Sequence, residues 1–236
     1  MAIGNLYLIP TTLGETNALE VLPLSVRKAV ESIDYYIVEN EKVARAAIKR
    51  IVPSKSQPSL DFNTINKFTD PTEMGSFLQP CLDGINMGLM SDAGCPGIAD
   101  PGAAIVTLAH QKNIRVIPLV GPSSILLAMM ASGLNGQNFA FNGYLPIDKA
   151  ERKSRIKALE KLSKTTGQAQ LFIETPYRNN QMLDALLVAL SGDCSICVAA
   201  DITLATEFIQ TKTVNEWKKN KVDLHKRPTL FIIQYN

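Results

Sequence analysis

Residues 91–102, which read Ser-Asp-Ala-Gly-Cys-Pro-Gly-Ile-Ala-Asp-Pro-Gly, decide the fold of this chain. The apolar run 85–90 comes directly before them and predicts a short buried strand, which the glycines and prolines end. A strand that runs into a Gly/Pro/Asp loop is typical of open α/β sheets, which present backbone groups to a small ligand at their carboxyl edge. Asp92 would then accept hydrogen bonds from that ligand. The alternative is a tight turn in which Asp92 caps the helix that begins near Pro101.

Strands and helices alternate on both sides of this loop, as the apolar spacing indicates. We expect strands at 6–9, 35–38 and 115–118, helices at 25–33, 41–50, 72–82 and 101–112, and a polar turn at 53–61. Such alternation predicts a mostly parallel sheet with covering helices. The first domain is therefore expected to be an α/β domain over residues 1–119.

The organisation changes after residue 119. Ser123 and Ser124 open an apolar helix at 125–131, and a strand at 139–141 leads to a turn at Asn142-Gly143. We expect a charged helix from Lys149, a helix at 180–190, and strands at 170–174, 196–200 and 229–234. These elements predict a second α/β domain over residues 120–236, built on a mixed sheet.

Composition excludes several classes of protein. The chain has 236 residues, 46% of them hydrophobic and 19% charged, and its formal net charge is +2. A nearly neutral chain gives no global field for nucleic acid, and no apolar run approaches the roughly 20 residues of a membrane span. Cys194 and Cys197 have redox spacing but lie in an apolar, strand-like run, so we expect free cysteines, no metal site and a cytoplasmic location.

The common catalytic motifs are absent from the sequence. It contains no Gly-x-x-x-x-Gly-Lys-Ser/Thr phosphate loop, no Gly-x-Gly-x-x-Gly fingerprint and no Gly-x-Ser-x-Gly elbow. The loops that follow the predicted strands carry small residues and few ionisable ones. Such loops are typical of a site that holds a cofactor through backbone groups and leaves the chemistry to that cofactor.

One segment is strongly basic. Residues 149–164 carry seven basic and two acidic side chains, with Arg152, Lys153 and Arg155 close together. Such a segment can follow the phosphates of RNA. The alternative is a solvated helix face, in which Glu160 and Lys164 form an i,i+4 pair.

Several motifs occur in the order found in a known family, over nearly the whole chain. They are residues 6–9 with Gly14, then 91–102, 118–124, 131–134, 141–146 and 172–178. On these residues the chain resembles the tetrapyrrole methylase superfamily of S-adenosylmethionine-dependent methyltransferases. Within that superfamily it is most similar to the ribosomal RNA small subunit methyltransferase I branch, which methylates a cytidine ribose 2′-hydroxyl.

The resemblance implies two α/β domains with S-adenosylmethionine in the cleft between them, an RNA substrate and a homodimer. It assigns cofactor contacts to residues of both domains: Gly14, Asp92, Ala93, Gly94, Ile98, Ser123, Ser124, Tyr144, Leu145, Pro228 and Thr229. On the substrate side it places Glu39 and residues 174–178, which include Tyr177 and Arg178. Arg152, Lys153 and Arg155 join them as the basic substrate contacts. The carboxylates that could act as the base for a hydroxyl are Glu39, Glu174 and Asp92, and the alternative for Glu39 is a cap at the end of its strand.

Some substrate-side motifs depart from that branch. Residues 39–42 read Glu-Asn-Glu-Lys where the branch usually has Asp-Thr-Arg after the glutamate, and 200–204 read Ala-Asp-Ile-Thr-Leu where Arg-Glu-Leu-Thr-Lys is usual. Three functions therefore stay open. They are methylation of an RNA ribose hydroxyl, methylation of a small molecule or tetrapyrrole, and a non-catalytic module that binds S-adenosylmethionine or RNA.

Overall fold

Short apolar strands and amphipathic helices alternate in the first half of the chain and build a parallel sheet. The computed structural model describes residues 3–66 and 68–235, and the chain divides into two units, Met1–Ser123 and Ser124–Asn236. The elements of unit 1 are, in order, β1 Asn5–Leu8, α1 Ala18–Val21, α2 Leu24–Ser32, β2 Tyr35–Val38, α3 Glu41–Ile51, β3 Asp61–Thr64, α4 Pro71–Phe77, α5 Gln79–Leu82, β4 Met87–Met90, α6 Gly102–Gln111 and β5 Arg115–Pro118.

The sheet of unit 1 has the strand order β3-β2-β4-β1-β5. The pairings between these strands are parallel, and Met87 of β4 lies opposite Leu6 of β1 on one side and Tyr35 of β2 on the other. Because β4 is central and parallel, both of its faces are covered, and all four of its residues are buried. The carboxyl ends of these strands therefore meet at a single edge of the sheet.

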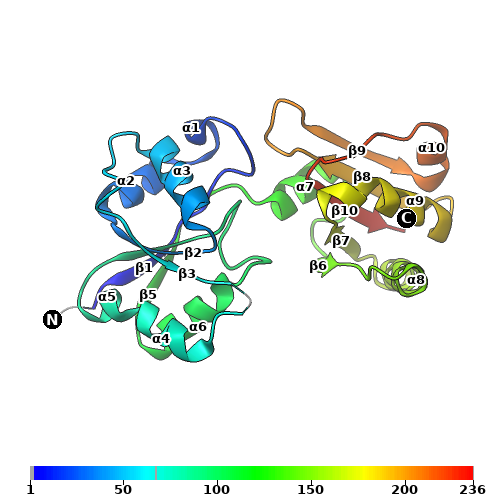
Figure 1. Cartoon of the computed structure of the whole chain (residues 1–236). Coiled ribbons are helices and arrows are strands. Elements are labelled where there is room, and N and C mark those ends of the chain that lie inside the picture. The colour runs from blue at the N-terminus through cyan, green and yellow to red at the C-terminus, as the bar shows by residue number, and fades with distance from the viewer. Residues whose placement is uncertain (1–2, 67, 236) are drawn as a thin grey trace. The chain divides into compact units, whose positions relative to one another are not determined.

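Helices cover both faces of this sheet (Figure 1). Helices α1, α2 and α3 pack on the face that carries Tyr36 and Val38, while α4, α5 and α6 pack on the face of Ile37 and Leu89. This division follows from the strand period of two, which sends neighbouring residues to opposite faces.

The elements of unit 2 are α7 Ser124–Ser132, β6 Phe139–Tyr144, α8 Lys149–Thr166, β7 Ala169–Ile173, the 3₁₀ turn η1 Pro176–Arg178, α9 Asn179–Ala189, β8 Ser195–Ala200, β9 Phe208–Thr213, α10 Val214–Lys219 and β10 Thr229–Gln234. Its sheet has the order β6-β7-β10-β8-β9, in which only the described β6–β7 pair is parallel. Helices α8, α9 and α10 share one core cluster with inward residues of this sheet, including Phe172 and Phe231. Helix α7 packs against β8, β9 and β10.

Polar side chains fix the ends of several helices. Asn40 accepts from the backbone N–H groups of Lys42 and Val43 and so begins α3 directly after β2. Thr213 and Glu216 form a capping box that begins α10, and Trp217 of that helix donates to the carbonyl of Ile196 at 2.9 Å. Glu160 of α8 accepts from the backbone N–H of Ser191 at 2.6 Å, so it ties α8 to the loop that follows α9.

The structure corrects several sequence-based boundaries. The predicted helix 72–82 is two helices, α4 and α5, and the predicted turn at Asn142-Gly143 lies inside β6, where the register with β7 shifts between Phe141 and Tyr144. Gly143 has φ +62°, a value that glycine adopts without strain, so the strand accommodates this bulge. Strands β3 and β9 and helices α1 and α10 have no counterpart in the sequence prediction. Over the described part of the chain, none of the helices is long and apolar enough to span a membrane.

We expect Gly121→Ala to destabilise unit 1. A Cβ atom at Gly121 would lie 2.3 Å from Cγ of Pro10, a rigid ring that cannot rotate away. Overpacking of this kind costs about 1–3 kcal/mol in the free energy of unfolding, measured by urea denaturation. Gly75→Ala is the matched control, because a Cβ there meets nothing within 4 Å and alanine favours helix α4. Equal stability of the two variants would contradict the close approach.

Glu160 is expected to make stability depend on pH. Burial alone would raise the pKa of this carboxyl, but hydrogen bonds from Ser191 and Lys157 outweigh burial and lower it. The ionised carboxylate therefore stabilises the fold above the pKa of the unfolded state, and this contribution is lost as the pH falls through the folded-state pKa. Glu160→Gln should lose about 1–2 kcal/mol at neutral pH and less on acidification. The exposed Glu151→Gln on the same helix is the control, and a variant with wild-type pH dependence would refute the role of Glu160.

Candidate functional site

The topology of unit 1 opens a crevice at the carboxyl edge of its sheet. The strand order sends the chain in opposite directions after β2 and after β4. After β2 the chain continues to β3, at one edge of the sheet, and after β4 it continues to β5, at the other edge. Strands β2 and β4 are neighbours, so their following loops diverge there. In open parallel sheets this is where ligands bind.

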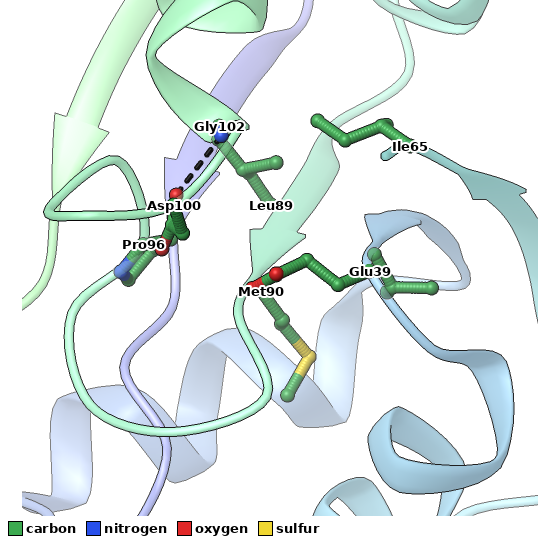
Figure 2. Close-up of a pocket in the computed structure, with 8 residues that line it drawn as sticks. Glu39, Ile65, Leu89, Met90, Pro96, Asp100 and Gly102 are labelled. Atoms are coloured by element: carbon green, nitrogen blue, oxygen red, sulfur yellow. Dashed lines mark hydrogen bonds between the residues drawn. The ribbon is translucent and has the colours of Figure 1, made fainter. Parts of the chain in front are cut away.

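Figure 2 shows the recess that lies at this point. Glu39 follows β2, Met90 ends β4, and Pro96 and Asp100 come from the loop after β4. The recess is lined by Val38, Glu39, Ile65, Leu89, Met90, Pro96, Asp100 and Gly102. Most of this lining is apolar, and its two carboxylates are those of Glu39 and Asp100.

Asp100 organises the loop at 91–102. Its Oδ1 accepts from the backbone N–H of Gly97 at 2.7 Å and of Gly102 at 2.9 Å, and the second of these bonds is drawn in Figure 2. Gly94 and Gly97 have φ values of +77° and +81°, which only glycine adopts without strain. The entrance of α6 is therefore held by Asp100, and the alternative in which Asp92 caps this helix is wrong.

The loop is also tied to the loops that follow β1 and β5. Thr11 donates its backbone N–H to the carbonyl of Gly94 at 2.9 Å, and Sγ of Cys95 donates to the carbonyl of Pro122 at 3.4 Å. Close contact between Gly121 and Pro10 joins the loops after β1 and β5 directly. These contacts leave Asp92 and Ala93 exposed at the outer side of the loop.

Three carboxylates concentrate negative charge at this edge. Glu39 accepts from the backbone N–H of Asp92 at 3.3 Å, and Asp100 lies across the recess from Glu39. Burial raises the pKa of Glu39, and the charges of Asp100 and Asp92 raise it further, against the lowering by that hydrogen bond. Burial also raises the pKa of Asp92. The ion pairs formed within the described residues include none of these three carboxylates.

The other predicted cofactor residues are placed as follows. In unit 1, Gly14 lies in the loop after β1, where its carbonyl accepts from the Thr12 hydroxyl at 2.7 Å, and Ile98 is 55% exposed. Ser123 ends unit 1, and Ser124 begins α7 of unit 2. Within unit 2, Tyr144 and Pro228 are exposed, whereas Leu145 and Thr229 are buried. The cofactor role of all these residues stays a prediction.

A second polar cluster lies in unit 2, at the carboxyl end of β7. Glu174 is buried, and its Oε1 accepts from the backbone N–H of Thr175 and from the guanidinium of Arg178, both at 2.6 Å. Oε2 of Glu174 has no hydrogen-bond partner among the residues described. The same holds for Oδ1 of the buried Asn179 and for Nε of Arg178. Tyr177, between Glu174 and Arg178 in sequence, is 69% exposed.

The predicted basic contacts on α8 differ in exposure. Lys153 and Arg155 are exposed, and Arg155 donates to Oδ1 of Asn142 at 3.0 Å. Arg152 is buried and donates to the carbonyl of Ile147 at 3.4 Å. The sequence suggested an ion pair between Glu160 and Lys164. In the structure Glu160 pairs with Lys157 instead, at 2.9 Å. The solvated face of α8 therefore contains Lys153 and Arg155 but not Arg152.

The cysteines give no sign of redox chemistry. All four are free, Cys194 and Cys197 are buried at the start of β8, and burial raises the pKa of Cys194 to about 12. Over residues 3–66 and 68–235, no group of three His, Cys, Asp or Glu side chains is arranged to hold a metal ion.

Sequence reasoning assigned no role to three residues that build the site. Asp100 was part of the decisive stretch, and its place before Pro101 and Gly102 at a helix entrance is a signal that could have identified it. Thr11 and Gly121 act through backbone contacts with residues about 80 and 110 positions away. Such partners leave no local pattern in the sequence.

Comparison with known proteins identifies the family. No family model matches the chain. It is 31% identical over 206 residues to ribosomal RNA small subunit methyltransferase I of Vibrio cholerae, a match that covers 87% of this chain and 67% of that protein. The protein of that name in Bacillus subtilis is 32% identical over 214 residues, covering 91% of this chain and 69% of the relative.

A solved structure supports the fold separately. The crystal structure of the methyltransferase CobJ matches with a TM-score of 0.64 at 14% identity, over 98% of this chain and 94% of that one. At this identity the likeness shows the fold alone, and it confirms the expected α/β fold. Because the two bacterial relatives match at 31% and 32% identity over most of their length, the chain belongs to the ribosomal RNA small subunit methyltransferase I family of methyltransferases.

Proposed function

We propose that this protein binds S-adenosylmethionine at the carboxyl edge of the unit 1 sheet and methylates a ribose 2′-hydroxyl of RNA in the small ribosomal subunit. One observation supports the cofactor site above all: the loop 91–102 borders a recess at the point where the chain leaves β2 and β4 in opposite directions. The names of the relatives support the RNA substrate.

The negative charge at this edge of the sheet fits S-adenosylmethionine. S-Adenosylmethionine carries a sulfonium and an ammonium, both positive, and the edge offers Glu39, Asp92 and Asp100 without a basic partner among the described residues. Burial raises the pKa of Glu39, and repulsion from Asp100 and Asp92 adds to it; a bound cation would relieve that repulsion. Asp92 and Ala93 are exposed at the outer side of the loop and accessible to a ligand.

When bound, this cofactor supplies an activated methyl group, so the protein has little covalent chemistry to perform. Its residues align the acceptor hydroxyl with the methyl group and exclude water. A carboxylate would accept the proton that leaves the hydroxyl as the oxygen–methyl bond forms, while the sulfur–methyl bond breaks and the sulfonium leaves as a neutral thioether. We assign this role to Glu39, which lies at the recess beside Asp92.

Glu174 is the weaker candidate for the base. Its side chain is 1% exposed, and one oxygen is already held by Arg178 and the Thr175 N–H. A base must lie within hydrogen-bond reach of the hydroxyl proton, and a carboxylate buried this deeply is closed to a substrate hydroxyl. We assign Glu174 to positioning of the 176–178 turn, and Lys153 and Arg155 of α8 to contact with RNA phosphates.

Asp92→Ala should weaken binding of S-adenosylmethionine by about 10- to 100-fold in isothermal titration calorimetry, as expected for loss of a charged hydrogen-bond acceptor. The matched control is Asp61→Ala, which removes the same charge at the start of β3, at the opposite edge of the sheet. Wild-type affinity in the Asp92 variant would remove this loop from the cofactor site. No binding by the wild-type protein would reject the proposed function itself.

Glu39→Gln should reduce transfer of labelled methyl groups to small ribosomal subunits by about 100- to 10,000-fold, the range for loss of a general base. Cofactor affinity should change far less. In the wild-type protein, only the ionised carboxylate accepts a proton, and the pKa of Glu39 is raised. The value of kcat/KM, which reports the free enzyme, should therefore fall on acidification at a higher pH than for an ordinary glutamate, and this fall should vanish in the variant.

The same assay separates the remaining functions. Transfer to a ribose 2′-oxygen, identified by nuclease resistance of the labelled position, supports the proposal. Cofactor binding without transfer to RNA from cells that lack this protein would favour a non-catalytic module. Full transfer by the Glu39 variant would leave the protein a methyltransferase but contradict the assigned base.

A further inference from the structure

An exposed aromatic group lies in unit 2, apart from the loop 91–102. Tyr177 is 69% exposed, although large aromatic side chains bury most of their area in a typical fold. The His225 ring meets the Tyr177 ring edge-on, with centroids 6.1 Å apart and planes at 74°. Nζ of Lys226 lies 5.9 Å from the centroid of the Tyr177 ring. Two rings and one cation therefore form a single surface group.

Hydrogen bonds hold the two segments of this group together. Lys226 donates its backbone N–H to the carbonyl of Pro176 at 3.1 Å, directly before Tyr177. Asn179 donates its side-chain amide to the carbonyl of Arg227 at 2.6 Å, and Oδ1 of Asn180 accepts from the backbone N–H of Leu224 at 2.8 Å. The side-chain bonds thus attach the start of α9 to residues 224–227 on both sides of the rings. The backbone segments that carry the two rings are thus held together before any ligand binds, which lowers the entropic cost of binding.

Backbone strain marks the same segment. Lys226 has φ +60°, in the left-handed region that lysine rarely adopts. This conformation persists because its backbone N–H is bonded to Pro176 and the neighbouring Arg227 is fixed through Asp201 at 2.7 Å. Strained residues of this kind concentrate at binding sites.

The surrounding charge is positive. Residues 218–227 contain Lys218, Lys219, Lys221, Lys226 and Arg227 against a single acidic residue, Asp223. Asp223 is occupied locally, since it accepts from Asn180 and from the backbone N–H of His225. Lys221 is paired with Asp184 and Arg227 with Asp201, whereas Lys218, Lys219 and Lys226 form no ion pair among the described residues. A polyanion that approaches the rings therefore meets the unpaired Lys226 beside them.

We propose that Tyr177, His225 and Lys226 form a stacking platform for an unpaired base of the RNA substrate. The exposed Tyr177 ring would stack on the base, His225 would support that ring from its edge, and Lys226 would attract the adjoining phosphate. This combination of aromatic faces and cations is how proteins bind single-stranded nucleic acid without needing base-edge readout. The inference rests on the proposed RNA substrate, and it adds His225 and Lys226 to the residues that contact it.

The test measures binding of a single-stranded 12-nucleotide RNA that contains 2-aminopurine, by fluorescence quenching and by anisotropy. Tyr177→Ala should weaken binding about 10-fold and abolish most of the quenching, because stacking is lost. Tyr177→Phe keeps the ring and should bind like the wild type. Lys226→Ala should reduce the salt dependence of binding, whereas Lys49→Ala, an exposed lysine of α3 in unit 1, should not.

Folding and the proposed function are checked separately. Thermal unfolding and calorimetry with S-adenosylmethionine should be unchanged in Tyr177→Ala, since the side chain is mostly exposed. If the wild type binds the RNA and Tyr177→Ala binds it equally well with equal quenching, the platform is refuted while the proposed function stands. If the wild type does not bind the RNA or methylate ribosomal subunits, the RNA substrate and the platform are both refuted.

Discussion

The site of unit 1 depends on one backbone hydrogen bond, from the N–H of Thr11 to the carbonyl of Gly94 at 2.9 Å. This bond joins the loop after β1 to the loop after β4, and it is possible because Gly94 adopts φ +77°. A Cβ at Gly94 would lie 3.1 Å from Leu13, so the approach leaves almost no room for a side chain. With this point fixed, the twelve-residue loop cannot collapse onto the sheet, and its residues 92 and 93 stay exposed at the edge.

The carboxylates at the same edge work against stability. Glu39 is partly buried beside Asp92 and Asp100, and both burial and repulsion raise its pKa. Other carboxylates of this chain are paired with a cation, as at Lys55–Asp34 and Arg227–Asp201. An uncompensated cluster in a recess between diverging loops therefore supports the proposed cofactor site, because perturbed carboxylates cluster at functional sites. A cationic ligand would supply the missing charge.

Much of this fold could be predicted from the sequence, because most of its strands are short, mainly apolar runs bounded by turns. Strands 35–38, 115–118 and 229–234 were predicted with the bounds that the structure shows. β3, in contrast, reads Asp-Phe-Asn-Thr and owes its conformation to pairing with β2, a contact that no local pattern records. β9 is likewise defined by its partner β8.

Within the site, the decisive stretch could be found from its glycines and prolines, but the role of each acidic residue could not. Asp92 and Asp100 are both flanked by small residues, and only the bonds to Gly97 and Gly102 show that Asp100 shapes the loop while Asp92 is left exposed. The distinction depends on where each side chain points, which is set by left-handed residues between them. Spacing alone does not specify that geometry.

Glu39 and Glu174 are a second pair of acidic residues whose environments the sequence does not distinguish. Each directly follows a buried strand and precedes a polar segment, so the sequence gives both the same signal. The structure places Glu39 beside two further carboxylates and Glu174 against a guanidinium at 2.6 Å. Glu39 lines the recess, whereas one oxygen of Glu174 is held by the Arg178 guanidinium and the backbone N–H of Thr175. The difference lies in the residues that follow each glutamate. Arg178, on a 3₁₀ turn four residues after Glu174, supplies a cation to that carboxylate. Asn40, directly after Glu39, begins α3 and carries no charge, and Glu39 has no ion pair among the described residues.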